Sequence, residues 1–242
     1  MPNIKLSSLN KGLVGHWTMS QDSLKGSLLA DKTPYENDGT IYGATFTTDR
    51  KGKANSAMKF NGVDDYIESI KEYPELSGIP SISVSMWADI DTSISIYSLL
   101  SLKRTGVNKA VLNIIGRYNI FKVSTRTTAD VYIEYGNIEI PSGFNYWTSI
   151  IEYDNKIIKI YLNGQLVETI SDIDMNDLSL DMENLVLGKQ SFGPFYAKCS
   201  MSDVRIYNRA LSETEIKTLY NSYNPKIVMK TSLPKIKLYG GD

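Results

Sequence analysis

Aromatic side chains dominate the residues of this sequence that could hold a ligand. The 242 residues include 16 Tyr, 6 Phe and 3 Trp. An aromatic ring stacks on the C–H surface of a sugar, and a tyrosine hydroxyl adds hydrogen bonds at a small entropy cost. Three rings crowd the Gly- and Pro-containing segment 191–196. Glycan contact, subunit contact and local packing are all open for the aromatic residues expected at the rim of the domain, which are Tyr35, Tyr42, Tyr118, Phe192, Phe195 and Tyr196.

A group of oxygen-bearing side chains follows the spacing of a calcium-binding loop. Counted from Asp172, acidic and amide residues occupy positions 1, 3, 5 and 12 of such a loop: Asp172, Asp174, Asn176 and Glu183. Position 6 is Asp177, where the sharp turn needs glycine. We therefore expect a solvated acidic loop rather than a metal site.

Nucleophilic catalysis finds little support in the sequence. His16 is the only histidine, and it lies in an apolar run between Gly15 and Trp17, which predicts a packed residue. Cys199 is the only cysteine, so an internal disulfide and a cysteine-based zinc site are excluded. A small buried hydrophobic role is expected for this thiol. The sequence predicts no enzyme.

Short strands account for most of the chain, with Gly, Asn, Asp and Pro between them, which predicts an all-β sandwich or barrel. The Asn163-Gly164 pair predicts a type I′ turn that joins strands 156–162 and 165–169. The other expected strands are 12–19, 40–46, 57–60, 66–69, 81–89, 97–102, 110–115, 120–124, 131–135, 146–152, 185–188 and 199–207.

One helix is expected at about 212–223. Ser212 and Glu215 have the spacing of a capping box, in which each side chain accepts a hydrogen bond from a backbone N–H at the helix start. An apolar stripe with helical spacing follows, and Pro225 ends it. A helix this short needs a surface to pack on, so it should dock on a sheet.

The composition changes towards the C-terminus. Residues 225–242 contain four lysines, Lys226, Lys230, Lys235 and Lys237, and one acid. We interpret this segment as a basic extended arm that pairs with a neighbouring subunit, or else docks on its own chain. Residues 1–11 would form an N-terminal arm, and 12–224 the main domain.

Charge and hydropathy exclude two kinds of partner. The formal net charge is −1, too small for the long-range attraction on which non-specific nucleic-acid binding relies. No apolar stretch is long enough to span a membrane, and no secretory signal is visible. We expect neither nucleic-acid nor membrane-spanning function.

Four motifs in a fixed order resemble the laminin-G-like, pentraxin-like jelly-roll domain of the concanavalin A type. They are 12–17 with 37–44, 57–67, 81–87 with Trp147 and 160–164, and 201–216. The resemblance covers about residues 12–223 and implies two stacked antiparallel sheets with one short helix. It also places Trp17, Trp87, Trp147 and Tyr161 in the core.

The resemblance also implies sites. Family members often bind calcium in a rim loop, which here would use Asp31, Asn37, Gly39 and Asp203. Some hydrolyse glycosides with a Glu-x-Asp-x-Glu row, of which Glu152-Tyr153-Asp154 is an incomplete match that lacks the third acid. A capped polar turn is the alternative to calcium.

These observations predict a non-catalytic recognition or assembly protein. We interpret it as a bacteriophage virion component, either a tail appendage or a capsid decoration. Its partners would be virion proteins or further copies of itself, with a cell-surface glycan as a possible ligand. The alternative is a standalone carbohydrate-binding or adhesion module, located outside a cell or at its surface.

Overall fold

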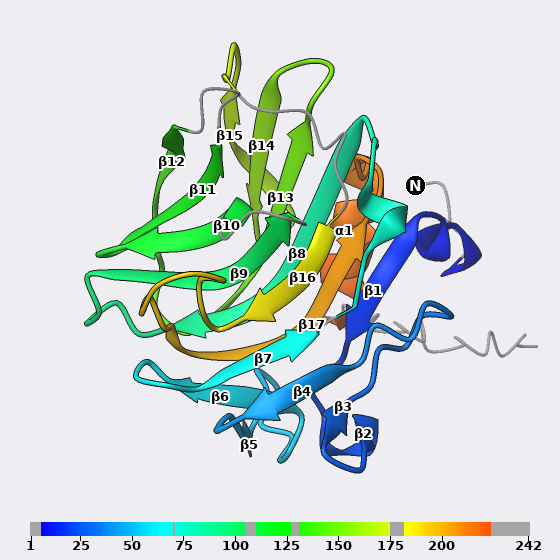
Figure 1. Cartoon of the computed structure of the whole chain (residues 1–242), viewed down its shortest axis with the longest axis vertical. Helices are drawn as coiled ribbons and strands as arrows, with labels where there is room; N and C mark the ends of the chain where they lie inside the picture. The colour runs from blue at the N-terminus through cyan, green and yellow to red at the C-terminus, as the bar shows by residue number, and fades with distance from the viewer. Residues whose placement is uncertain (1–5, 70, 105–109, 127–130, 175–181, 224–242) are drawn as a thin grey trace, which may run out of the picture.

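The computed structural model describes residues 6–69, 71–104, 110–126, 131–174 and 182–223. Two antiparallel sheets face each other in a jelly-roll sandwich, as the sequence predicted (Figure 1). Within these ranges, no helix is long and apolar enough to cross a membrane. The predicted C-terminal arm, with Lys226, Lys230, Lys235 and Lys237, lies outside the described residues.

Sheet A has the strand order β15-β14-β13-β8-β17-β6-β5, and β1 pairs with the second half of β17. Its strands are β15 (Gln165–Ile170), β14 (Ile157–Leu162), β13 (Phe144–Glu152), β8 (Ser81–Ile90), β17 (Lys198–Tyr207), β6 (Ala57–Asn61), β5 (Thr45–Thr47) and β1 (Leu13–Trp17).

Sheet B has the order β12-β11-β10-β9-β16-β7-β4-β3-β2. Its strands are β12 (Tyr132–Glu139), β11 (Ile120–Arg126), β10 (Ala110–Arg117), β9 (Ile96–Arg104), β16 (Met182–Leu187), β7 (Tyr66–Ser69), β4 (Gly39–Tyr42), β3 (Leu28–Leu29) and β2 (Leu24–Lys25). The described residues also form short 3₁₀ helices: η1 (Leu6–Asn10) precedes β1, and η2 (Gln21–Ser23) and η3 (Pro74–Leu76) lie in connections between strands.

The main core fills the space between the sheets. Strand alternation turns one set of side chains inward from each sheet, and these inward residues are almost fully buried. Phe121 of sheet B stacks on Trp147 of sheet A with ring centroids 4.0 Å apart and planes within 5°. This contact ties the two layers together.

A second apolar cluster covers the opposite side of sheet A. Helix α1 (Glu213–Tyr223) packs there with Leu9 of η1, over Trp87 and Tyr161. Both predicted core aromatics are therefore buried, but beneath the helix rather than between the sheets. Figure 1 shows α1 behind sheet A, and no helix of the described residues lies over the outer face of sheet B.

Two local predictions are confirmed by the backbone. Asn163 and Gly164 have positive φ angles of 51° and 78°, as a type I′ turn requires. At the start of α1, the Glu215 N–H donates to the Ser212 hydroxyl at 3.3 Å, and the Ser212 N–H donates to the Glu215 carboxylate at 2.9 Å. Both elements formed where their sequences placed them because the interactions that define them are local.

Candidate functional site

The connection between β16 and β17, residues 188–197, lies over the outer face of sheet B, and we call it the covering loop. It folds back on itself, since the Ala197 N–H donates to the Gly188 carbonyl at 2.8 Å and the Gln190 N–H donates to the Phe195 carbonyl at 3.2 Å. Gly188 is required at its base: its φ is +81°, and a Cβ there would lie 2.4 Å from the Phe60 ring. The loop is therefore fixed at both ends.

A buried row of polar side chains fastens the covering loop to the sheet. The Ser191 N–H donates to the Ser101 hydroxyl oxygen at 3.0 Å, and Ser101 donates to Asn113 Oδ1 at 2.7 Å. Asn113 Nδ2 donates in turn to the Ser124 hydroxyl at 3.2 Å. Ser101, Asn113 and Ser124 are fully buried and uncharged, so each depends on the next for its hydrogen bonds.

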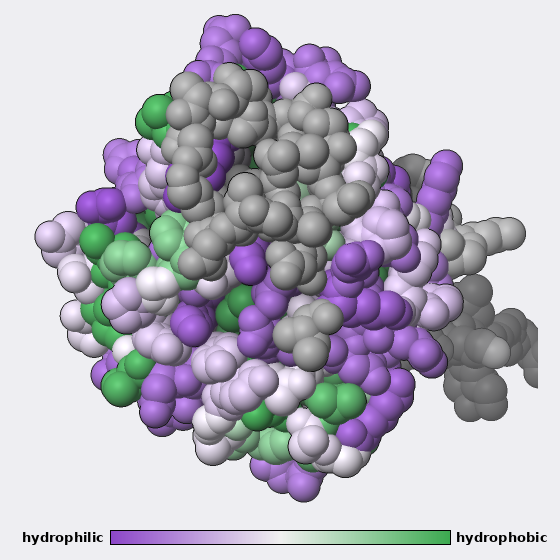
Figure 2. Space-filling model, in the orientation of Figure 1, coloured by the Kyte–Doolittle hydropathy of each residue, from purple (hydrophilic) through white to green (hydrophobic). Residues whose placement is uncertain are grey.

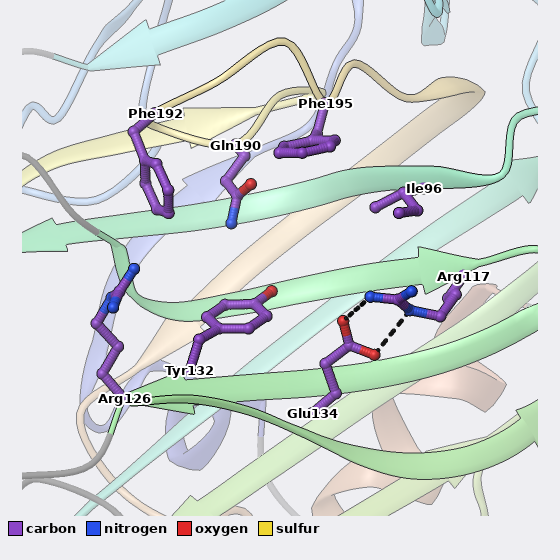
Figure 3. Close-up of a pocket in the computed structure, with 8 residues that line it drawn as sticks. All are labelled: Ile96, Arg117, Arg126, Tyr132, Glu134, Gln190, Phe192 and Phe195. Carbon is purple, nitrogen blue, oxygen red and sulfur yellow. Dashed lines mark hydrogen bonds and ion pairs between the residues drawn. The ribbon is translucent and has the colours of Figure 1, made fainter. Parts of the chain in front are cut away.

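Beside this row, the covering loop and strands β9 to β12 enclose a cavity of about 270 Å³ (Figure 3). Outward-facing side chains of β10, β11 and β12 form its floor, and three side chains of the covering loop form its opposite wall. Its lining residues are Ile96, Arg117, Arg126, Tyr132, Glu134, Gln190, Phe192 and Phe195. This volume lies near the lower end of small-ligand sites, so the cavity fits about one sugar ring.

A bidentate ion pair forms one side of the cavity. Arg117 Nε donates to Glu134 Oε2 at 2.9 Å, and Arg117 Nη2 donates to Oε1 at 2.6 Å. The hydrogen bond to Glu134 raises the pKa of Arg117 above its ordinary value. Two-point pairing fixes both side chains, which leaves their remaining donors and lone pairs in defined directions.

Aromatic rings and a second arginine form the other side. The Arg126 guanidinium lies 5.7 Å from the Tyr132 ring centroid and 5.4 Å from that of Phe192. Burial raises the pKa of Tyr132, against the lowering effect of a hydrogen bond to Ser124, so its phenol stays protonated. The Gln190 side chain points into the cavity (Figure 3).

A second aromatic group lies on the same face of sheet B, on the other side of the covering loop. Tyr42 of β4 stacks on Tyr66 of β7 with centroids 4.4 Å apart and planes within 13°. The Tyr196 ring centroid lies 6.4 Å from that of Tyr66. The Lys189 ammonium lies 4.5 Å from the Tyr66 centroid and 5.2 Å from the Tyr196 centroid. We call these four residues the tyrosine platform.

The structure divides the six predicted aromatic residues into three groups. Phe192 and Phe195 share the cavity, while Tyr42 and Tyr196 share the tyrosine platform. Tyr35 and Tyr118 are exposed in other loops and join neither. In Figure 2, apolar residues gather on the left of the molecule, where β10 ends and the covering loop passes.

The predicted calcium ligands are engaged in another way. The Asp31 carboxylate accepts four hydrogen bonds, from the His16, Thr33 and Asn37 N–H groups and from the Thr33 hydroxyl, at 2.6–3.1 Å. Asn37 Nδ2 donates to the Val14 carbonyl at 2.9 Å, and Gly39 pairs with Leu29 in the sheet. Hydrogen-bond donors of the protein therefore face the lone pairs of the Asp31 carboxylate that would coordinate a cation.

Asp203 lies beside basic groups rather than beside other acids. It pairs with His16 Nε2 at 2.7 Å and with Arg205 Nε at 3.1 Å, at a β-bulge of β17 where its φ is +50°. Among the described residues, no three His, Cys, Asp or Glu side chains are grouped as metal ligands would be. This arrangement does not fit a calcium ion, and calcium binding stays a prediction. His16 was predicted to be a packed residue, and its side chain is 16% exposed and contacts Asp203 through Nε2.

The second acidic group spans a gap in the described residues. Asp172 and Asp174 are exposed, and the Asp174 carbonyl accepts a hydrogen bond from Tyr135 at 3.1 Å. Asn176 and the Glu183 side chain lie outside what the structure describes. The interpretation as a solvated acidic loop stays a prediction.

The candidate catalytic residues are held in structural contacts. Glu152 ends β13 and accepts a hydrogen bond from Lys159 at 2.6 Å, which lowers its pKa below the ordinary value. Asp154 lies in the exposed turn that follows. Cys199 is buried, and burial raises the pKa of its thiol well above the ordinary value, which favours the unreactive protonated form.

Sequence reasoning missed six residues of the cavity: Ile96, Arg117, Arg126, Tyr132, Glu134 and Gln190. Arg117 and Glu134 are far apart in the chain and meet because β10 and β12 both pair with β11. Side chains alternate along β11 and β12, which places Arg126, Tyr132 and Glu134 on the outer face of sheet B. This alternation is the sequence pattern that could have indicated these residues.

Comparison with known proteins identifies the class to which this fold belongs. A family model of the concanavalin A-like lectin/glucanases superfamily matches residues 61–217, more than half of the chain. The chain belongs to this superfamily, which confirms the predicted resemblance. No curated protein sequence matches it.

Solved structures with the same fold include binding domains of botulinum neurotoxins. One is from botulinum neurotoxin type C, whose cell entry depends upon interaction with two ganglioside molecules (TM-score 0.69, 14% identity, 90% of this chain and 53% of that one). Another is the binding domain of serotype D (0.68, 16%, 90% and 52%). A third, from neurotoxin DC, is in complex with rat synaptotagmin II (0.67, 14%, 88% and 52%). The chain spans about half the length of these structures, and identities this low show a shared fold.

Proposed function

We propose that this chain is a non-catalytic, lectin-like module that binds a glycan in the cavity beneath the covering loop. The observation that carries this proposal is the combination of Phe192, Phe195 and Tyr132 with a fixed Arg117–Glu134 pair around one small cavity. Sites that recognise sugars need both an apolar ring surface and a few well-placed polar groups. Cell entry of a structurally similar toxin depends upon interaction with ganglioside molecules, which supports the same interpretation.

The lining residues divide the recognition of a sugar into two parts. Phe195 and Tyr132 offer ring faces to the C–H surface of a pyranose. Glu134, Arg117 and Gln190 offer acceptors and donors to its hydroxyl groups. Because the Arg117–Glu134 geometry exists before the ligand arrives, binding needs little ordering of these two side chains.

The same lining favours binding over hydrolysis. Glycoside hydrolysis commonly uses two carboxyl groups that flank the bond to be broken, about 5 to 10 Å apart. Glu134 is the single carboxylate among the described residues that line the cavity, and both of its oxygens accept hydrogen bonds from Arg117. The described lining therefore lacks the second carboxyl group that this mechanism needs.

A glycan array followed by calorimetry tests this proposal. Phe195→Ala should weaken binding of the best glycan about tenfold, since a well-oriented aromatic contact contributes about 1 kcal/mol or more. Tyr35→Ala is the control, because Tyr35 lies in another loop and does not line the cavity. The proposal fails if wild type binds no glycan, or if Phe195→Ala binds as tightly as wild type.

We further propose the assembly role that the sequence favoured, in which the basic arm joins this module to a virion or to other copies of the chain. Its support is the excess of lysine in residues 225–242. Removing these residues should leave a folded monomer that no longer assembles, as measured by light scattering and by thermal unfolding. An unchanged mass in solution would overturn the arm's role and leave the glycan proposal untouched.

A further inference from the structure

Two kinds of contact hold the covering loop on sheet B. Its two arms, residues 188–190 and 195–197, are held by backbone groups. Hydrogen bonds join the arms to each other, and the Ser98 N–H of β9 donates to the Phe195 carbonyl at 3.2 Å. Bonds between backbone groups stay in place when a side chain is truncated. The arms therefore do not depend on a side-chain hydrogen bond.

The tip of the covering loop, residues 191–194, is held by one side chain of the sheet. The Ser191 N–H donates to the Ser101 hydroxyl oxygen at 3.0 Å, and the hydroxyl oxygens of these two serines lie 3.0 Å apart. Within the described part of the chain, the tip makes no further hydrogen bond. Its position therefore depends on a single hydroxyl group.

The Ser101 hydroxyl is itself fixed in direction. Ser101 is fully buried, and its shortest contact is to Asn113 Oδ1, to which it donates at 2.7 Å. A hydroxyl group has one hydrogen, so its lone pairs remain for the loop. Asn113 is oriented in turn by the hydrogen bond from its Nδ2 to Ser124 at 3.2 Å. The sheet thus presents an acceptor in a defined direction, towards Ser191.

The two rings of the cavity wall differ in how they are held. Phe192 follows Ser191 directly, and its ring centroid lies 5.4 Å from the Arg126 guanidinium inside the cavity. Phe195 belongs to an arm that backbone bonds hold. Figure 3 shows the two rings apart from each other along the wall. Loss of the Ser101 hydroxyl should therefore displace Phe192 and leave Phe195 in place.

We propose that Ser101 is a positioning residue of the glycan site, which acts on the ligand through Ser191 and Phe192. Ser101 does not line the cavity itself. Because its hydroxyl holds the tip before a ligand arrives, binding does not have to order the Phe192 ring. This inference rests on the proposed glycan-binding function and adds to it the group that fixes one of its ring contacts.

Amide hydrogen exchange tests the positioning without any ligand. Ser101→Ala removes the acceptor of the Ser191 N–H, so exchange at Ser191, followed by NMR, should become about tenfold faster or more. The amides of Gln190 and Ala197 in the arms should exchange as in wild type. An unchanged rate at Ser191 would overturn the inference. An equal acceleration at all three amides would also overturn it, because Ser101 would then stabilise the whole loop.

A double-mutant cycle tests whether Ser101 acts through Phe192. Ser101→Ala and Phe192→Ala should each weaken binding of the best glycan about fivefold, as expected for the loss of one aromatic contact. Together they should still cost about fivefold, because the same contact is lost only once. Ser101→Ala combined with Phe195→Ala should cost about fiftyfold, the product of two independent effects.

Ser83→Ala is the matched control for a lost buried hydroxyl. Ser83 of β8 is fully buried in sheet A, and its hydroxyl oxygen accepts the Leu211 N–H at 3.0 Å. This variant should have a lower melting temperature and wild-type glycan affinity. If it weakens glycan binding as much as Ser101→Ala does, the effect reflects stability alone and the positioning role is overturned. Circular dichroism shows whether each variant is folded.

The binding results separate this inference from the function beneath it. If glycan binding depends on Phe195 but Ser101→Ala binds as tightly as wild type, the inference is overturned and the proposed function stands. A cost of about 25-fold for Ser101→Ala with Phe192→Ala would mean two independent effects and would overturn it as well. If wild type binds no glycan of any kind, both proposals fail.

Discussion

Asn113 supports Ser101, the residue that holds the covering loop, by linking it to Ser124 through a single amide. Its oxygen accepts from Ser101 and its nitrogen donates to Ser124, and the residue has no exposed surface. Asn113→Asp replaces the donor by an acceptor and buries an ionisable group. We expect a loss of about 2 kcal/mol or more in the free energy of unfolding, measured with urea.

The matched control is Asn10→Asp, which makes the same chemical change at an exposed position. Its effect should stay within about 0.5 kcal/mol of wild type, as is usual for surface substitutions. Equal stability of the two variants would mean that the buried row does not hold the covering loop.

Asp31 accepts hydrogen bonds that can hold its loop without a cation. Its carboxylate receives four hydrogen bonds from one short stretch of chain and from His16. Asp31→Ala would leave several buried donors without an acceptor, so we expect a loss of about 2 to 3 kcal/mol.

Calcium separates this explanation from the predicted metal site. Under the hydrogen-bond explanation, the melting temperature of wild type is the same in calcium and in a chelator, and Asp31→Ala lowers it equally in both. A melting temperature that rises with calcium in wild type alone would restore Asp31, Asn37, Gly39 and Asp203 as ligands.

At the scale of the element, helix α1 depends on an ionised cap. Burial opposes the ionisation of Glu215, but hydrogen bonds from Arg209 and Ser212 outweigh it and hold its pKa below the ordinary value of 4.5. Between the two pKa values the unfolded chain binds more protons than the folded chain, so stability falls as pH decreases below about 4.5. We expect Glu215→Gln to be less stable than wild type at pH 7.

The pH dependence identifies Glu215 as the group responsible. The difference in unfolding free energy between wild type and Glu215→Gln should shrink as pH falls from 6 to 3, because wild type then loses the contribution that the variant lacks. Urea unfolding across this range measures it. A constant difference would show that the cap works without the carboxylate charge.

Elements with local signals were predictable from sequence, and the site was not. The Asn163-Gly164 turn and the Ser212–Glu215 cap each depend on residues within a few positions of one another. The cavity instead depends on the order β12-β11-β10-β9 and on a loop that arrives from β16. Pairing across a sheet is set by the packing of the whole core, which no short window of sequence contains.

A smaller part of the candidate site, its loop aromatics, was still visible in advance. Phe192, Phe195 and Tyr196 stood out because a loop with Gly and Pro cannot bury three rings easily. Arg117 and Glu134 did not stand out because each looks like an ordinary charged residue on a strand. Their role appears only when β10 and β12 pair with the two edges of β11, so that the two long side chains meet across it.

Over the whole molecule, the outer faces of the two sheets are covered by different kinds of side chain. Helix α1 and η1 cover sheet A with an apolar cluster, so that face contributes to stability. The outer face of sheet B has the covering loop and both aromatic groups. Because α1 takes up the exposed apolar surface of sheet A, ligand contacts can be concentrated on the other side of the molecule.

A ligand in the cavity should therefore stabilise the entire sandwich. The cavity exists only when β9 to β12 and the covering loop are all folded, so the ligand binds the native state and not the unfolded chain. At a glycan concentration one hundred times its Kd, this linkage contributes about 2.7 kcal/mol. For a domain of this size, that corresponds to a rise of about 5 to 10 °C in melting temperature.

Thermal unfolding at increasing glycan concentration measures this coupling. Wild type should show a melting temperature that keeps rising with the logarithm of ligand concentration, and Phe195→Ala should need about ten times more glycan for the same rise. Tyr35→Ala should follow the wild-type curve. A glycan that binds tightly by calorimetry but leaves the melting temperature unchanged would have to bind the unfolded chain as well, which would remove the folded cavity as its site.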